Sequence, residues 1–398
     1  MIRTSETIEI PRKEDIEILK KSLSCQEQEI LFIDIETTGL SPKTADIYLI
    51  GAACCLNGAI NIIQFMAESA AEERQILSAF SEFSKGFRKL VHFNGDRFDV
   101  PFLQAKYEKY GISDPMADME SFDLYKQVKP YKKQLGLPDC KQKTIELYLG
   151  IDRQDQYDGG KLISVYKSYV EKRGAEEKRL LLLHNYEDVK GMFGLLPMLY
   201  YDEFFKQFKN MPEVSVRTDQ EIDENSYMDG LEGNLPVRAV KVSANRFKDY
   251  DGREKSEVFM KLRLPYELPS SLAGNIDGCY FKTEGDEATL RVPLYETELK
   301  YFYSNYKDYY YLPMEDVAIH KSLAEFVDKA HREKATASNC YTKKAGQFLR
   351  EWDLCFAPFF KNDYEDDSFF FDLNENMKKS RFAMSLYASH VIAHILDS

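Results

Sequence analysis

The sequence lacks any long apolar run, and its cysteines are few and unpaired in spacing. No stretch approaches the length of apolar residues that a membrane-spanning helix needs, and the charged start, Met1–Thr7, is not that of a signal peptide. The seven cysteines are odd in number and include no Cys-x-x-Cys pair, so neither a disulfide framework nor a zinc site is indicated. We therefore expect a protein of the reducing cytoplasm without a membrane partner.

Positive charge is also in short supply. The chain has 53 Lys and Arg against 66 Asp and Glu, which gives a net charge of −13. Such a chain repels nucleic acid on average, so a polyanionic partner requires a local basic patch or bound metal. The hydrophobic content of 44% indicates a packed globular protein, and 398 residues are enough for two domains.

Two carboxylates interrupt an apolar strand near the start of the chain. Asp34 and Glu36 lie within the stretch Leu31–Leu40, and residues two apart on a strand project from the same face. The next alternate position is Phe32, which argues against a solvated polar edge, although two solvated acids remain the alternative. A hard divalent cation such as Mg²⁺ or Mn²⁺ is the natural partner for such a pair.

Two later stretches each add a carboxylate. Asn94 ends a short buried strand, and Asp99 stands at the start of the helix that follows, where it can cap the helix or face a pocket. On a second helix over 180–193, His184 and Asp188 lie one turn apart. They are either a surface pair or a pair that faces the same pocket as the earlier acids.

The order of these motifs resembles the DEDD exonuclease superfamily. The likeness consists of Asp-x-Glu on the first strand, Asn-Gly-x-x-Phe-Asp before a helix, and a His and an Asp on a late helix. The intervening segment, with Asp123-Leu-Tyr, Lys143–Arg153, Gly159 and Tyr166–Tyr169, is similar to the bacterial YprB-like ribonuclease H domain over about 28–205. The resemblance implies an α/β fold, a ribonuclease H-like mixed five-stranded sheet flanked by helices.

The resemblance also implies two-metal hydrolysis of phosphodiester bonds in DNA or RNA, from a single strand or a 3′ end, with two Mg²⁺ or Mn²⁺ ions per site. The implied metal ligands are Asp34, Glu36, Asp99 and Asp188. The candidate nucleic-acid contacts in this half are Thr37, Asn94, Lys143 and Arg153. For Lys143 and Arg153, solvated surface charge is an equal alternative.

The spacing of His184 departs from the family pattern. His184 precedes Asp188 by four residues, the spacing that superfamily members with tyrosine use. An imidazole there can orient or deprotonate the attacking water. Alternatively, Tyr186 or a water takes that role and His184 only hydrogen-bonds Asp99 or Asp188.

The composition changes after residue 208, and the second half reads as antiparallel strands with helices. We expect an N-terminal extension over 1–28, the ribonuclease H-like domain over 29–208, a linker over 209–235 and an α+β accessory domain over 236–398. The aromatic stretch Tyr301–Tyr311 either fills the seam between a sheet and its helices or stacks bases. A helix is expected from about 315 to 334.

A local excess of basic residues follows between residues 321 and 350, where only three acids occur. It is a candidate nucleic-acid track, and a solvated helix face is the alternative. The basic residues are Lys321, Lys329, Arg332, Lys334, Lys343, Lys344 and Arg350.

The sequence therefore predicts a metal-dependent 3′→5′ exonuclease acting on DNA or RNA. Two alternatives stay open: a structure-specific endonuclease on the same fold, and a catalytically silent protein that binds nucleic acid or serves as a scaffold.

Overall fold

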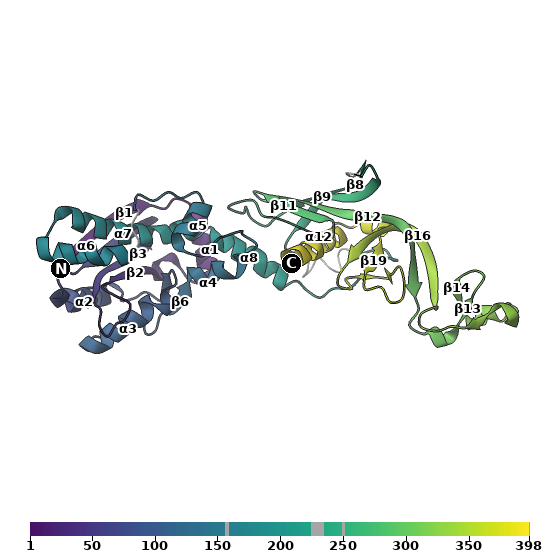
Figure 1. Ribbon diagram of the computed structural model, residues 1–398, viewed down its shortest axis with the longest axis horizontal. Helices are drawn as coiled ribbons and strands as arrows, with labels where there is room; N and C mark the ends of the chain where they lie inside the picture. The colour runs from purple at the N-terminus through teal and green to yellow at the C-terminus, as the bar shows by residue number, and fades with distance from the viewer. Residues whose placement is uncertain (156–158, 224–234, 249–250, 398) are drawn as a thin grey trace. The chain divides into compact units, whose positions relative to one another are not determined.

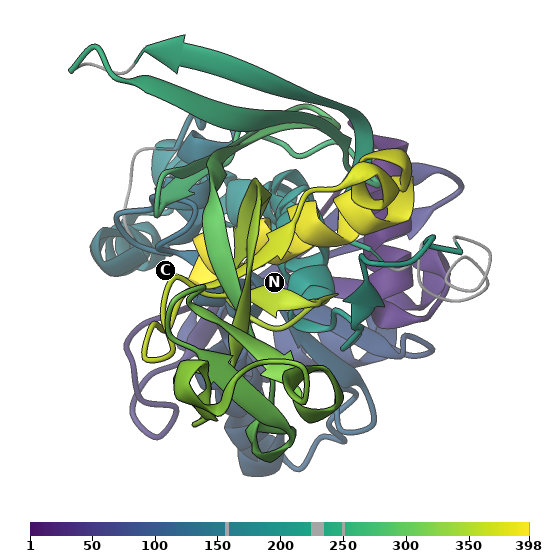
Figure 2. The same cartoon turned by 90° about the vertical axis from the view of Figure 1, so that its right-hand side faces the viewer.

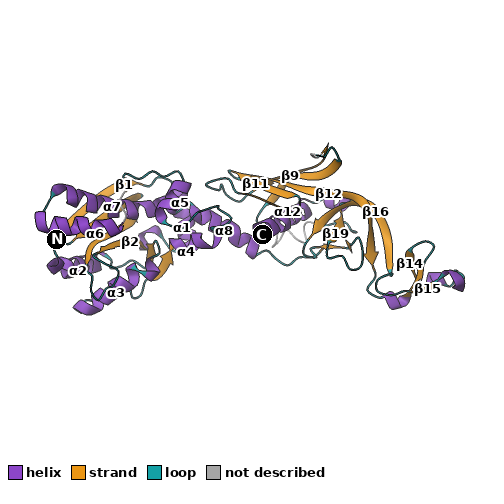
Figure 3. Cartoon of the chain, in the orientation of Figure 1, coloured by secondary structure: helices purple, strands orange, loops and turns teal. Residues whose placement is uncertain are grey.

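The chain divides into two compact units in the computed structural model. The structure describes residues 1–155, 159–223, 235–248 and 251–397. Unit 1 comprises Met1–Asp202 and unit 2 comprises Glu203–Ser398. Unit 1 interleaves helices and strands, whereas unit 2 consists mainly of strands (Figure 3). Part of the predicted linker, residues 224–234, lies outside the described residues.

Unit 1 is built on a six-stranded sheet in the order β1-β4-β3-β2-β5-β6. The strands are β1 Ile2–Glu9, β2 Ile30–Thr37, β3 Ile47–Leu56, β4 Ala59–Met66, β5 Lys89–His92 and β6 Glu120–Asp123. Strands β2, β3 and β4 are antiparallel as predicted, and β5 and β6 run parallel to β2. The predicted mixed sheet is confirmed, with six strands instead of five, because the segment expected as an N-terminal extension supplies β1 at the edge beside β4.

Helices cover both faces of this sheet (Figure 1). The helices of unit 1 are α1 Lys13–Leu23, α2 Glu73–Phe83, α3 Asp99–Tyr110, α4 Leu124–Val128, α5 Gln142–Tyr148, α6 Gly159–Lys172 and α7 Ala175–Leu195, and α8, Met198–Lys209, begins in unit 1 and ends in unit 2. Helices α2 and α3 pack into the core on one face, and α6 and α7 pack on the other.

Alternation along β2 decides which side chains meet which helices. Three apolar side chains join the core with α2 and α3: Leu31, Ile33 and Ile35. Phe32 points the other way, and its ring stacks on Phe193 of α7 with centroids 4.1 Å apart. Asp34 and Glu36 share the face of Phe32, so both carboxylates project toward α7.

Unit 2 contains an eight-stranded antiparallel sheet, as expected for the second half. Its strands are β8 Arg238–Lys248, β9 Glu254–Arg263, β10 Ala273–Ile276, β11 Cys279–Glu284, β12 Glu287–Phe302, β16 Tyr341–Glu351, β18 Phe359–Phe360 and β19 Phe369–Asp372. The long strand β12 pairs with β9 and β11 along its first half and with β16 along its second. Behind the strands lies the buried helix α12, Arg381–Asp397, preceded by α11, Glu375–Lys379 (Figure 2).

Smaller pieces complete unit 2. Within the segment predicted as a linker, β7, Val216–Arg217, pairs in parallel with β17, Phe356–Ala357. Near the end of α12, the ring of His394 stacks on Trp352, and His390 accepts the backbone N–H of Trp352 at 3.0 Å.

Across the described ranges, no helix combines the length and the apolar character that crossing a membrane demands.

The predicted helix over 315–334 is wrong. The segment supplies β14 Val317–His320 and β15 Glu333–Lys334, which form a three-stranded sheet with β13 Tyr309–Leu312. Its helical parts are short: the four-residue helix α10 Lys321–Ala324 and a single 3-10 turn at Lys329–His331. Asp316 adopts a left-handed φ of 53° and reverses the chain between β13 and β14. Four tyrosines of the aromatic stretch pack here against small buried residues, so they fill a separate small core: Tyr303, Tyr306, Tyr309 and Tyr311.

Candidate active site

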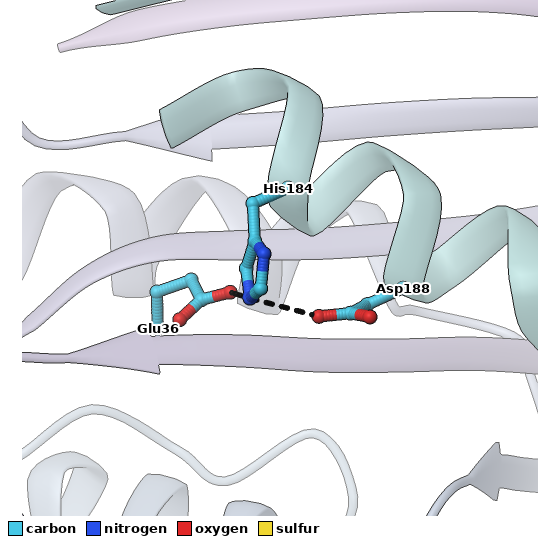
Figure 4. A group of neighbouring side chains, drawn as sticks. All are labelled: Glu36, His184 and Asp188. Carbon is cyan, nitrogen blue, oxygen red and sulfur yellow. Dashed lines mark ion pairs between the residues drawn. The ribbon is translucent and has the colours of Figure 1, made fainter. Parts of the chain in front are cut away.

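The site lies where the carboxyl end of β2 meets α7. Glu36, from the strand, and His184 and Asp188, from the helix, point toward one another (Figure 4). His184 Nε2 lies 3.5 Å from Glu36 Oε1 and 3.2 Å from Asp188 Oδ2. One potential ligand atom from each of the three lies within 4.8 Å of the others.

The other two predicted acids join this group. Asp34 Oδ2 accepts a hydrogen bond of 2.9 Å from Asn185 Nδ2 on α7. Asp99, buried at the first position of α3, accepts the backbone N–H of Ile35 at 3.1 Å through its Oδ1. Three separate elements thus place four carboxylates around the end of β2.

Burial and mutual repulsion shape the charge of these acids. Burial raises the pKa of Asp34 well above its ordinary value, and the nearby charges of Asp188, Glu36 and Asp99 raise it further. Burial, followed by the charges of Asp188 and Asp99, likewise raises the pKa of Glu36, and burial raises that of Asp99 to about 7. Four carboxylates gathered around one strand end are a poor structural core but a suitable oxygen donor set for a hard divalent cation.

Without metal, unit 1 is expected to lose stability as the pH rises from about 4 through about 7. The folded chain holds the Asp99 proton with a pKa of about 7, against 3.8 as the ordinary value. Stability from this group is therefore complete below about pH 4 and lost through pH 7, at about 1.4 kcal/mol per pKa unit. Thermal unfolding followed by circular dichroism in chelator should give a lower midpoint at pH 7.5 than at pH 5.5.

The chain offers an internal control for this prediction. The only tryptophan, Trp352, lies in unit 2, so its fluorescence follows that unit while far-UV circular dichroism follows both. Added Mg²⁺ should raise the unit 1 midpoint at pH 7.5 by binding the folded state. A unit 1 midpoint that is the same at both pH values in chelator would contradict the raised pKa of Asp99.

A buried amide network, which the sequence analysis missed, holds Asp34. Asn185 is fully buried, and its Oδ1 accepts from Gln64 Nε2 at 2.9 Å, while Gln64 Oε1 accepts from Thr4 Oγ1 at 3.1 Å. Helix α7 comes this close because β3 carries Gly51, where a Cβ would lie 2.3 Å from Asn185 Oδ1. The available signal was a glutamine and a glycine inside otherwise apolar strands.

The contacts of His184 and Tyr186 show which of the two side chains faces the acids. Its Nδ1 lies 2.6 Å from Asp155 Oδ2, so the carboxylate of Asp155 orients the ring, and the same oxygen accepts from Lys143 Nζ at 3.0 Å. Tyr186 instead donates its hydroxyl to Glu6 on β1 at 2.9 Å. Of His184 and Tyr186, it is therefore His184 that faces the acids. Asp155, which orients His184, is a further residue of the site that the sequence did not reveal.

The acids open into a cleft of about 640 Å³. Besides Asp34, Glu36 and Asp188, its lining includes Phe93, Asn94, Arg97, Tyr125, Lys141 and Lys143. The rings of Phe93 and Tyr125 meet edge to face with centroids 6.0 Å apart. Neither Arg97 nor Lys141 stood out in the sequence, because single exposed basic residues carry no spacing signal.

The remaining residues predicted in unit 1 take different positions. Asn94 lines the cleft from a left-handed turn with φ of 59°. Thr37 donates its hydroxyl to the carbonyl of Gly39 at 2.7 Å, within the turn after β2. Arg153 is nearly buried and pairs with Glu146 and Asp188, so it lies behind the acids and is not among the described residues that line the cleft.

The basic residues of unit 2 separate into paired and exposed groups. Lys343 pairs with Asp316, and Lys344 pairs with Asp372 at 2.7 Å. The guanidinium of Arg332 lies 4.9 Å from the ring centroid of Tyr310. Three lysines are exposed on or beside the small sheet: Lys321, Lys329 and Lys334.

Comparison with known proteins supports the fold of unit 1. The family model of the RNase_H superfamily matches residues 31–200. This match and the sheet topology confirm the predicted resemblance, so the fold of this segment is ribonuclease H-like.

One curated relative is the PolC-type DNA polymerase III of Caldanaerobacter subterraneus subsp. tengcongensis, which is 25% identical over an alignment of 232 residues that covers 47% of this chain. The match spans only 16% of that relative's length.

Two solved structures are more distant. A family B DNA polymerase from Pyrobaculum calidifontis is 16% identical with a TM-score of 0.37, covering 70% of this chain and 35% of the other. The E. coli exonuclease I in complex with a dT13 oligonucleotide is 12% identical with a TM-score of 0.31, covering 59% of this chain and 54% of the other. Both TM-scores lie below 0.5, so neither structure bears on the argument.

Proposed function

We propose that the ribonuclease H-like unit is a metal-dependent nuclease, and more narrowly a 3′→5′ exonuclease on DNA or RNA. The observation that carries this is the convergence of Glu36, His184 and Asp188 beside the carboxylates of Asp34 and Asp99. A structural role does not require four carboxylates gathered at the end of one strand, where neighbouring charges help to raise the pKa values of Asp34 and Glu36. The match to the RNase_H superfamily model supports the same class of chemistry.

In this proposal Asp34, Glu36, Asp99 and Asp188 are the ligands of two Mg²⁺ or Mn²⁺ ions. Bound ions of this kind supply Lewis-acid stabilisation of the phosphoryl group and an activated water. His184 Nε2 lies on the cleft side of its ring, and Nδ1 faces Asp155. Held in this orientation, His184 accepts a proton from the attacking water at Nε2.

The basic and aromatic residues that line the cleft suit a nucleic-acid strand. Arg97 and Lys141 supply positive charge for phosphates, and Asn94 supplies an amide. Lys143 contributes less, since its ammonium is paired with Asp155. Phe93 and Tyr125 offer apolar rings, which stack on bases regardless of sequence. Thr37 is a weaker candidate because its hydroxyl already donates a hydrogen bond to the carbonyl of Gly39.

For unit 2 we propose an auxiliary role in holding nucleic acid. Lys321, Lys329 and Lys334 carry this role, with Arg332 beside the ring of Tyr310. Lys343 and Lys344 contribute less, since each is paired with an acid. The positive charge available to bind nucleic acid here is thus smaller than the number of basic residues between 321 and 350 suggests.

The decisive experiment compares 5′-labelled linear and circular single strands of DNA and RNA in Mg²⁺ or Mn²⁺. Linear strands should shorten in a ladder, while circles stay intact because an exonuclease needs an end. The variant Asp188→Asn should show no ladder, and chelator should abolish it in the natural protein.

Each other outcome has a defined meaning. Metal-dependent cutting of circles would replace the exonuclease by a structure-specific endonuclease. Binding of strands without any metal-dependent cleavage would refute the enzyme and leave a silent nucleic-acid-binding protein. A ladder that persists in Asp188→Asn would identify a contaminating nuclease.

A further inference from the structure

An arginine is buried directly behind the candidate metal site. The side chain of Arg153 is 9% exposed and that of its partner Glu146 is 1% exposed. Arg153 Nε donates to Glu146 Oε2, and Arg153 Nη2 donates to Glu146 Oε1 at 2.6 Å. The remaining nitrogen of the guanidinium, Nη1, donates to Asp188 Oδ1. A planar guanidinium can hold two carboxylates in this fixed geometry, which a lysine cannot.

The surroundings of this pair are shaped to accommodate it. Gln142 Nε2, on α5, donates to Glu146 Oε1 at 3.0 Å and to the backbone carbonyl of Asp188 at 2.9 Å. On α7, Gly191 stands one turn after Asp188, and a Cβ there would lie 2.1 Å from Glu146 Oε1. The absence of a side chain at this position leaves the space that the ion pair fills.

This arrangement divides the two oxygens of Asp188 between two tasks. Oδ1 accepts from Arg153, while Oδ2 lies 3.2 Å from His184 Nε2 on the side of Glu36. We propose that Arg153, held by Glu146, is a positioning residue that fixes the rotation of the Asp188 carboxylate and presents Oδ2 to a divalent metal. This inference rests on the proposed function, in which Asp188 is a metal ligand.

Charge alone does not explain the pair. The positive charge of Arg153 and the negative charge of Glu146 cancel, so together they leave the net charge near the four acids unchanged. Removing Arg153 alone would leave Glu146 buried without its partner and make the site more negative. Removing both residues takes away the hydrogen bond to Asp188 at constant net charge. The double variant therefore separates orientation from electrostatics.

The test is Mn²⁺ binding by isothermal titration calorimetry, without nucleic acid, in Arg153→Met/Glu146→Met. Replacing a buried ion pair by apolar side chains is commonly tolerated, so the fold should persist. We expect the Kd for Mn²⁺ to rise by about 10- to 100-fold, the usual range for loss of a residue that orients a metal ligand. Nuclease activity should fall at low Mn²⁺ and recover in part at high Mn²⁺.

A matched control uses another buried ion pair of unit 1. Lys106 Nζ lies 2.9 Å from Glu73 Oε1, with side chains 1% and 0% exposed. Lys106→Met/Glu73→Gln removes this charge pair and keeps an acceptor for the backbone N–H of Ile47, which Glu73 binds at 2.7 Å. Its Kd for Mn²⁺ should equal that of the natural protein.

The single variant Arg153→Lys keeps the charge and protects the test against misfolding of the double variant. One ammonium cannot reproduce the fork, so its Kd should rise by several-fold. An unchanged Kd in either Arg153 variant would overturn the positioning role. Absence of Mn²⁺ binding and cleavage in the natural protein would instead overturn the proposed nuclease.

Discussion

Asp34→Asn is expected to abolish nuclease activity while it stabilises the metal-free protein. The amide keeps the shape of the carboxylate and can still accept the hydrogen bond that Asn185 Nδ2 donates. It removes one charge from a group in which burial and the charges of Asp188, Glu36 and Asp99 raise the pKa of Asp34. Metal ligands contribute several kcal/mol to the transition state, so we expect a loss of about 1,000-fold or more in kcat.

The stability half of this prediction has a matched control. Asp15 on α1 is also a buried acid whose pKa is raised by burial, but it lies outside the cleft lining. Asp15→Asn should also stabilise the protein at pH 7.5, yet leave cleavage unchanged. If Asp34→Asn retained metal-dependent cleavage, Asp34 would not be a metal ligand. If it lowered the unfolding midpoint in chelator, the acids would not be mutually repulsive.

Much of the candidate site could be predicted because its signals are local. Two acids at alternate positions of β2 share a face by the geometry of any strand, and Phe32 on that face marks it as covered. His184 and Asp188, four apart on α7, share a face by the geometry of any helix. What brings the two faces together is the packing of Phe32 on Phe193. The apolar residues of both segments predict that the strand and the helix pack together, but they do not predict that Phe32 and Phe193 make the contact.

The parts that escaped prediction depend on distant contacts. Asn185, Gln64 and Thr4 come from three elements, and only the folded sheet places them in one network under Asp34. Asp155 lies outside any element, and nothing in its immediate sequence shows that it contacts His184. Each residue is unremarkable alone, because an isolated polar residue is more often a surface residue than a partner.

The misjudged elements have equally physical causes. The largely polar residues of β1 predict an extension, yet an edge strand needs only one covered face and the ladder to β4. Around 315–334, the packing of the preceding tyrosines on Ala318 and Cys340 favours strands over the predicted helix. Tertiary packing outweighed local preference in both segments.

His184→Ala is expected to reduce kcat by about 10²- to 10⁴-fold and to leave metal binding in place. Its Nε2 lies between Glu36 and Asp188, and its Nδ1 is fixed by Asp155, so the ring is oriented to accept a proton on the cleft side. Alanine removes the base but none of the four carboxylates. Single-turnover cleavage at saturating Mn²⁺ measures the loss, and calorimetry without nucleic acid measures the retained binding.

Tyr186→Phe distinguishes the histidine from its neighbour as the base. The hydroxyl of Tyr186 donates to Glu6 at the sheet edge, so its removal should leave kcat unchanged. If Tyr186→Phe lost activity while His184→Ala kept it, the tyrosine would be the base, as the spacing in superfamily members with tyrosine suggests. If both variants kept full activity, proton transfer would pass directly to bulk water. A loss confined to His184→Ala, with Mn²⁺ still bound, assigns the base to the imidazole despite its tyrosine-like spacing.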